Sequence, residues 1–267
     1  MQEFKFKKAF GQNFISDINI INNIVKCSNI KGNSLVIEIG PGSGNLTKEL
    51  AKVSKYVLAY EIDDRLEDIL DENLINCNNV TVLFEDFMKC DLKSDLAEFS
   101  YDHLYVTANI PYYITTPIIE KIINSGITFE NITLMMQKEV GDRLSAKPGN
   151  RNYGSLTVFL NYYFDVKKQF IVNRNYFTPR PNVDSVVITL TRKDGRKALS
   201  NDIFFKLIRD AFQYKRKNIR NNLKSYDLTI IEDELKKHNL DLNVRSEELS
   251  LDIFLDIADR LAKDKVN

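Results

Sequence analysis

The chain has 267 residues, of which 43% are hydrophobic and 28% charged, as expected for one medium-sized globular domain or for one domain with a small appendage. Its 37 Lys and Arg balance 37 Asp and Glu, so the net charge by itself indicates no partner. No apolar stretch is long enough to span a bilayer and the first residues lack the pattern of a signal peptide, so we expect a cytoplasmic protein with no membrane partner.

Strand-like and helix-like segments alternate along the first part of the chain. Apolar residues at helical spacing follow Asp17, a suitable N-cap, and predict a helix over 17–28. Apolar runs and amphipathic segments then succeed each other, which indicates βαβ units and a mostly parallel sheet covered on both faces. The expected strands lie in 34–44, 55–63, 79–87, 101–109, 132–137 and 183–192, and the expected helices in 45–53, 65–75 and 116–126.

The strand pattern stops near residue 193, and four segments with helical periodicity follow, at 204–212, 218–223, 230–238 and 247–262. We therefore predict an α/β domain over 1–194 and a small all-α domain over 195–267. The segment from Lys193 to Lys224 contains ten Lys or Arg but only three Asp or Glu. This basic stretch is a hint of nucleic-acid binding, although by itself a solvated helix face explains it better.

A glycine-rich turn, Glu38-Ile-Gly-Pro-Gly-Ser-Gly44, closes the first predicted strand and opens a helix. Such turns let the backbone approach a ligand closely, but they also occur as plain strand-to-helix connections. Glu61 ends the second strand, where a carboxylate can accept from ribose hydroxyls, and Asp86 ends the third, where it can accept from the amine of adenine. Together these features favour an adenosine-containing cofactor. The G-x-G-x-G spacing differs from that of dinucleotide-binding folds and disfavours a nicotinamide oxidoreductase.

The fourth strand ends in Asn109-Ile110-Pro111-Tyr112. Proline cannot continue a sheet ladder, so the strand stops there and leaves an amide and a phenol at the ligand edge. The amide oxygen and a backbone carbonyl can accept both hydrogens of an exocyclic amine, which localises the nitrogen lone pair, and Tyr112 can stack on a base. These groups suit transfer of a methyl group from a sulfonium to an adenine amine, accelerated mainly by positioning.

Several motifs, in this order, resemble those of the ribosomal RNA adenine N6-dimethyltransferases, which use S-adenosylmethionine and have a Rossmann-like methyltransferase fold. The motifs are FGQNF at 10–14, EIGPGSGNLT at 38–47, EDF at 85–87, NIPYYITTP at 109–117 and FTPRPNVDS at 177–185. The isoleucine of NIPY is common in the branch that methylates large-subunit rRNA. FGQNF, ITTP and the segment 137–158 are instead similar to the branch that dimethylates two adjacent adenosines in the 3′-terminal hairpin loop of 16S rRNA and serves small-subunit biogenesis.

The resemblance implies roles for individual residues. Catalytic roles fall on Asn109, Pro111, Tyr112 and Phe177, the last as the aromatic that closes on the target base. Contacts with S-adenosylmethionine fall on Asn13, Ile15, Gly40, Gly42, Glu61, Asp86 and Asn109. Contacts with the phosphates of rRNA are expected for Lys7, Lys8, Arg143, Lys147, Lys215, Arg216, Lys217 and Arg220.

The resulting hypothesis is a monomeric enzyme that acts on the 16S rRNA of the small ribosomal subunit. A large-subunit methyltransferase that confers macrolide resistance is the alternative within the family, and a ribosome-assembly factor that acts by binding is the alternative of another class. Three widely spaced cysteines and two histidines favour neither a metal site nor a disulfide framework.

Overall fold

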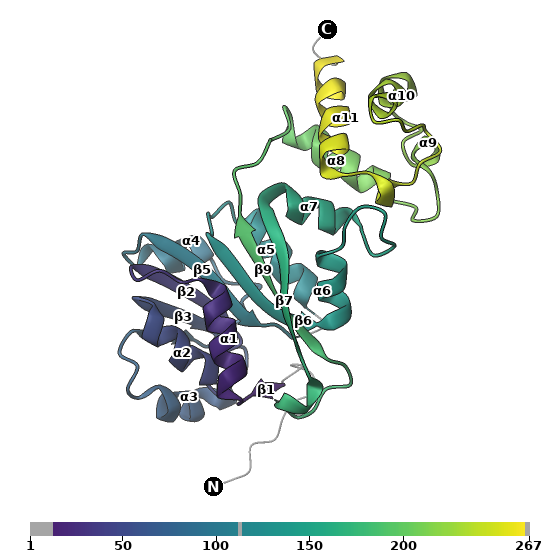
Figure 1. The fold of residues 1–267 in the computed structure, drawn as a ribbon. Coiled ribbons are helices and arrows are strands. Elements are labelled where there is room, and N and C mark those ends of the chain that lie inside the picture. The colour runs from purple at the N-terminus through teal and green to yellow at the C-terminus, as the bar shows by residue number, and fades with distance from the viewer. Residues whose placement is uncertain (1–12, 112–113, 265–267) are drawn as a thin grey trace. The chain divides into compact units, whose positions relative to one another are not determined.

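The computed structural model describes residues 13–111 and 114–264 (Figure 1). Three residues named above, Lys7, Lys8 and Tyr112, lie outside the described residues. The chain forms two compact units: the sheet unit, Met1–Gly141 with Lys167–Arg192, and the helical unit, Asp142–Val166 with Lys193–Asn267. The helical unit thus includes residues 142–166 in addition to the C-terminal helices.

A seven-stranded sheet with the order β4-β3-β2-β5-β6-β9-β7 is the centre of the sheet unit. The strands β4, β3, β2, β5 and β6 pair in parallel, and β9 is antiparallel to β6. Every residue of β2 is buried, as a parallel strand covered on both faces requires. The strands are β2 Ser34–Ile39, β3 Tyr56–Tyr60, β4 Val80–Leu83, β5 His103–Asn109, β6 Asn131–Gln137, β7 Phe164–Val172 and β9 Ser185–Arg192.

Helices cover the two faces of this sheet (Figure 1). Helix α1 begins where the Asp17 carboxylate accepts from the backbone N–H groups of Asn19 and Ile20, so the capping role predicted for Asp17 is confirmed. Helices α1, α2 and α3 pack in sequence on one face, and α4 and α5 lie on the other. Their bounds are α1 Ile18–Ser28, α2 Asn45–Val53, α3 Glu67–Leu74, α4 Leu92–Ala97 and α5 Thr115–Asn124.

A second, two-stranded sheet joins distant parts of the sheet unit. Its strands are β1 Phe14–Ile15 and β8 Phe177–Thr178, which pair antiparallel with Phe14 opposite Thr178 and Ile15 opposite Phe177. Ile15 and Phe177 are both buried, with 5% and 3% of their surface exposed, and belong to one apolar cluster with Ile21 and Ile24 of α1. This pairing anchors the start of the described chain beside the loop that follows β7.

The helical unit has its own apolar core. Buried side chains from most of its helices form one cluster, in which the rings of Tyr162 and Phe204 stack at 4.7 Å between centroids. Its helices are α7 Ser155–Tyr163, α8 Asn201–Ala211, α9 Ile219–Asn222, α10 Leu228–Lys237 and α11 Leu251–Asp264, and α6 Lys138–Leu144 runs from the sheet unit into it. Short 3-10 turns complete the fold at η2 Asp64–Leu66, η3 Arg174–Tyr176 and η4 Ser246–Glu248.

The fold class predicted from the sequence is confirmed: a mostly parallel α/β sheet accompanied by a small set of C-terminal helices. Strand β7 was not expected from the sequence, since its lysines and glutamine interrupt the apolar pattern, as is common on an edge strand. Among the described residues, none of the helices combines the length and the hydropathy that a membrane span requires.

Packing of α6 on β9 leaves no room for a side chain at Gly141. A Cβ atom there would lie 2.2 Å from Cγ1 of Val186, far inside van der Waals contact. We expect Gly141→Ala to lower the free energy of unfolding by roughly 1–3 kcal/mol through overpacking, measured by urea denaturation. Gly32→Ala is the matched control, since nothing lies within 4 Å of that position. Adding Val186→Ala to Gly141→Ala should recover part of the lost free energy of unfolding. If Gly141→Ala is as stable as Gly32→Ala, the close approach of Gly141 to Val186 is wrong.

Candidate active site

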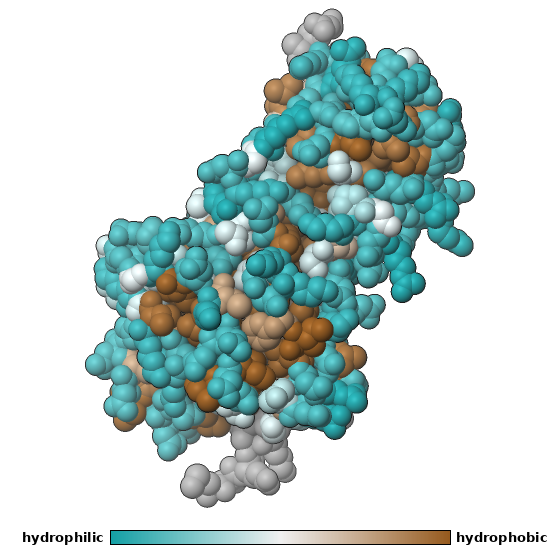
Figure 2. All heavy atoms as spheres, viewed as in Figure 1, coloured by the Kyte–Doolittle hydropathy of each residue, from teal (hydrophilic) through white to brown (hydrophobic). Residues whose placement is uncertain are grey.

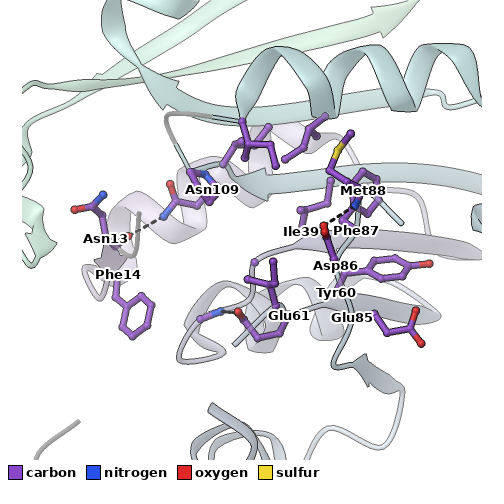
Figure 3. Close-up of a pocket in the computed structure, with 17 residues that line it drawn as sticks. Asn13, Phe14, Ile39, Tyr60, Glu61, Glu85, Asp86, Phe87, Met88 and Asn109 are labelled. Atoms are coloured by element: carbon purple, nitrogen blue, oxygen red, sulfur yellow. Dashed lines mark hydrogen bonds between the residues drawn. The ribbon is translucent and has the colours of Figure 1, made fainter. Parts of the chain in front are cut away.

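A pocket opens at the carboxyl ends of the parallel strands of the sheet unit (Figure 3). It is bordered by the segments that follow β2, β3, β4 and β5, which is the usual ligand edge of such a sheet. Carboxylates and an amide face apolar walls within it. The residues that line the pocket are Asn13, Phe14, Ile39, Gly40, Gly42, Tyr60, Glu61, Ile62, Glu85, Asp86, Phe87, Met88, Asn109, Ile110, Pro111, Ile114 and Ile118.

The glycine-rich turn forms one wall. Gly40, Gly42 and Gly44 have positive φ angles of 72°, 58° and 79°, which disfavour any side chain there. At Gly42 a Cβ atom would also lie 2.9 Å from the ring of Phe14. The backbone of the turn is therefore bare on the pocket side, and a ligand can approach it closely.

Glu61 follows β3 directly and is only 5% exposed. One carboxylate oxygen accepts the N–H of Gly42 at 3.1 Å and the other accepts the N–H of Asp63 at 3.0 Å. Burial raises the pKa of Glu61 above its ordinary value, and these backbone N–H groups oppose that rise. The carboxylate is thus fixed against the glycine turn and keeps lone pairs for the hydroxyls of a ribose.

Asp86 lies on the next strand connection, after β4. Its Oδ1 accepts the N–H of Met88 at 2.9 Å, which orients the carboxylate, and the Nζ of Lys89 lies 3.8 Å from Oδ2. Figure 3 places Asp86 between Glu61 and the apolar side chains of Phe87 and Met88. An aromatic ring with an exocyclic amine fits such a wall, because its faces meet apolar groups and its amine meets a carboxylate.

Asn109 ends β5 with its side chain in the pocket (Figure 3). Its Nδ2 donates to the carbonyl of Asn13 at 2.9 Å. Because the amide nitrogen is engaged there, Oδ1 is the group that remains to accept from a ligand. The backbone N–H of Ile110 donates to the carbonyl of Met135 at 3.0 Å, which holds the start of the NIPY segment against β6.

Glu38 lies beneath the glycine turn and is 1% exposed. Burial raises the pKa of Glu38 to about 8, and the negative charge of Glu61 adds to the rise. Within the described part of the chain, its Oε2 has no hydrogen-bond partner. A proton on this carboxyl removes the repulsion between the two acids, so the turn is most stable when Glu38 is neutral.

The other residues named from the sequence fall in different places. Pro111 lines the pocket, whereas Ile15 borders a small neighbouring cavity beside the glycine turn. Phe177 lies in the apolar cluster and is not among the residues that line the pocket. Its role on the target base stays a prediction. The remaining predicted RNA contacts belong to the helical unit: Arg143, Lys147, Lys215, Arg216, Lys217 and Arg220.

Sequence reasoning did not single out the apolar lining of the pocket. Phe14, Tyr60, Ile62 and Phe87 directly adjoin predicted polar positions, and Met88 follows Asp86 by two residues, so closeness in sequence was the available signal. Ile114 and Ile118 come from the start of α5 and resemble ordinary core residues in the sequence. Their contribution is evident only once α5 is placed over the sheet edge.

The chemistry of the pocket fits S-adenosylmethionine. A buried, fixed carboxylate suits ribose hydroxyls, an apolar wall with Asp86 suits adenine, and the bare glycine turn with Asn109 leaves room for a charged amino-acid tail and a methyl donor. Among the residues that the structure describes, no group of three or more His, Cys, Asp or Glu could hold a metal ion.

Fold and pocket together define a Rossmann-like methyltransferase. Residues 3–263 match the family described as Ribosomal RNA adenine dimethylase. The chain belongs to this family, and its cofactor is S-adenosylmethionine, as expected from the sequence.

Known relatives agree with this membership. The chain is 46% identical over 268 residues to Ribosomal RNA small subunit methyltransferase A of Streptococcus gordonii, covering 97% of this chain and 92% of that protein. It is 44% identical over 265 residues to the protein of the same name from Lactiplantibacillus plantarum, covering 96% and 90%.

Two solved structures are also similar. A dimethyladenosine transferase from Plasmodium falciparum superposes with a TM-score of 0.81 at 30% identity, covering 94% of this chain and 98% of that one. The 23S rRNA methyltransferase ErmE superposes with a TM-score of 0.77 at 26% identity, covering 94% and 100%.

The buried acid makes stability depend on pH. Between the ordinary pKa of 4.5 and about 8, folded protein holds a proton on Glu38 that unfolded chain has released, so this residue makes stability fall as pH rises. Glu38→Gln should remove that contribution and exceed the wild type in free energy of unfolding by a few kcal/mol at about pH 9 but not at about pH 5, measured by urea denaturation. Exposed Glu98→Gln is the control. If the stability of Glu38→Gln depended on pH as strongly as that of the wild type, Glu38 would not be the source of this pH dependence.

Proposed function

We propose that the protein dimethylates N6 of two adjacent adenosines in the 3′-terminal hairpin loop of 16S rRNA, and that it acts as a monomer on the small ribosomal subunit, in the cytoplasm, during subunit biogenesis. The observation that carries the proposal is the similarity over nearly the whole chain, at 44–46% identity, to proteins named Ribosomal RNA small subunit methyltransferase A. The pocket residues required for transfer to an adenine amine are present in this chain.

S-adenosylmethionine supplies an electrophilic methyl group on a sulfonium. The chain's residues hold the reactants in line and prepare the amine. Asn109 Oδ1 accepts one hydrogen of the adenine amine, since its Nδ2 is held by the carbonyl of Asn13, and the carbonyl of Ile110 accepts the other. These bonds favour a pyramidal nitrogen with a localised lone pair. No strong general base is needed, because the nitrogen's proton becomes acidic only after transfer.

The residues proposed to bind the cofactor belong to the sheet unit, and both units contribute proposed contacts with RNA. Glu61 accepts from the ribose and Asp86 from the adenine amine of the cofactor, with Asn13, Gly40 and Gly42 beside them. Tyr112 and Phe177 are the proposed aromatic contacts of the extruded target base. The basic side chains proposed to neutralise rRNA phosphates are Lys7, Lys8, Arg143, Lys147, Lys215, Arg216, Lys217 and Arg220.

Two observations favour a second candidate, transfer to large-subunit rRNA. The isoleucine of NIPY and the similarity to the structure of ErmE both fit that activity. The lower identity of 26% to ErmE, against 46% to the small-subunit methyltransferase of S. gordonii, makes the small subunit the better supported substrate. A factor that only binds the subunit does not require an amide oriented like that of Asn109.

Mapping of the methylated base separates these candidates. Purified protein with labelled S-adenosylmethionine is offered undermethylated small and large ribosomal subunits separately. We expect two label-bearing dimethyladenosines, adjacent to each other near the 3′ end of 16S rRNA, and none in the large subunit. Label confined to 23S rRNA would favour the resistance activity, and binding of the small subunit without label would favour the assembly factor.

Asn109 provides a test of the mechanism. Asn109→Ala removes the acceptor that faces the amine and should lower kcat by roughly 10²–10³-fold, the usual cost of losing one preorganised hydrogen bond to the reacting group. Affinity for the small subunit should stay within a few-fold of wild type, because Asn109 is far from the basic residues in sequence and carries no charge. Asn79→Ala, which removes an amide that bonds the carbonyls of Ala51 and Ser54, is the control for folding. Near-normal turnover would refute the role of Asn109.

A further inference from the structure

The loop between β7 and β9, residues 173–184, presents an aromatic ring and two arginines to solvent. Tyr176 is 47% exposed and Val183 43%, and Arg174 and Arg180 are also exposed. Figure 2 shows apolar side chains among polar ones over this end of β7, where Ile171 is 54% exposed. None of these five residues has a role in the site described above.

Hydrogen bonds within the loop hold its two ends together. The backbone N–H of Arg174 donates to Oδ1 of Asp184 at 3.0 Å, and its guanidinium donates to the carbonyl of Asn182 at 2.9 Å. Oδ1 of Asn173 accepts the N–H of Asn175 at 3.0 Å. A loop closed in this way presents its outward side chains in a fixed arrangement, which lowers the entropy lost when they bind a partner.

The same loop adjoins the catalytic edge. Its central strand β8 pairs with β1, so that Thr178 lies opposite Phe14. The preceding residue, Asn13, lines the pocket and accepts the amide of Asn109. The pairing ends at Thr178, opposite the pocket residue Phe14, so Arg180 lies two residues beyond the paired strand.

Outward and inward residues alternate along this segment. Phe177 points into the apolar cluster and is 3% exposed, while its neighbours Tyr176 and Thr178 are exposed. Tyr176 is therefore the accessible aromatic ring of the segment. The guanidinium of Arg180 makes no hydrogen bond or ion pair with the described part of the chain, so it is available to an anion.

We propose that this loop binds the nucleotides that flank the target adenosine, with the ring of Tyr176 stacked on a neighbouring base and Arg180 paired with a backbone phosphate. The inference rests on the proposed function. An adenosine taken out of its stack leaves an unstacked neighbour. The exposed ring of Tyr176, just before the strand that pairs with the pocket residue Phe14, replaces the lost stacking. The next adenosine is thereby held close to the site while the first is methylated.

The test compares Tyr176→Ala, Tyr176→Phe and Arg180→Ala on undermethylated small subunits. Stacking of one base predicts that Tyr176→Ala raises KM about 5- to 150-fold with little change in kcat, while Tyr176→Phe keeps the wild-type KM. Arg180→Ala should weaken binding. It should also reduce the slope of log affinity against log salt concentration by about one, the amount expected for the loss of one phosphate contact. Arg192→Ala is the control, since it removes the same charge at the opposite end of β9.

A direct readout uses a 3′-terminal 16S hairpin carrying 2-aminopurine beside the target adenosine. Wild-type protein and Tyr176→Phe should quench its fluorescence on binding, and Tyr176→Ala should not. Thermal melting confirms that each variant is folded. Unchanged KM and quenching in Tyr176→Ala, while the wild type methylates the small subunit, would overturn this inference alone. A wild type that leaves the small subunit unmethylated would instead refute the proposed function.

Discussion

The functional edge depends on the parallel register of three central strands. Ile39 of β2 pairs with Tyr60 of β3 on one side and with Ala108 of β5 on the other. The next residues of the three strands, Gly40, Glu61 and Asn109, therefore reach the same edge at the same height. A slip of one residue in either pairing would turn each side chain to the opposite face of the sheet and separate these groups.

This register also places two acids close together in a region of low polarity. Glu61 is compensated by the N–H groups of Gly42 and Asp63, whereas Glu38 has an oxygen without a partner in the described residues. Burial of an unpaired carboxylate is costly, and the chain avoids most of that cost by keeping Glu38 protonated. The positive φ angles of the glycine turn add backbone constraint at the same point. The unfavourable local features are thus concentrated at the glycine turn that forms one wall of the pocket.

Most of the sheet could be predicted because its strands are buried on both faces and read as continuous apolar runs. The position of Glu61, Asp86 and Asn109 at the pocket could be predicted because each lies at or just after the end of such a run. Strand β7 could not, since an exposed edge tolerates lysine. The pairing of Phe177 with Ile15 was also out of reach, because the two residues are 162 positions apart in the sequence. Long-range contacts of this kind leave no local pattern.

The pairing of β1 with β8 links the pocket to the loop of residues 173–184. The carbonyl of Asn13 orients the side-chain amide of Asn109, and the adjacent Phe14 pairs with Thr178 of the loop that carries Tyr176 and Arg180. Each strand is only two residues long, so its position depends on its partner and on the burial of Ile15 and Phe177. A displacement of the loop would move β1 and, with it, the carbonyl that orients Asn109. Accurate packing of two buried apolar side chains therefore supports the position of the polar groups in the pocket.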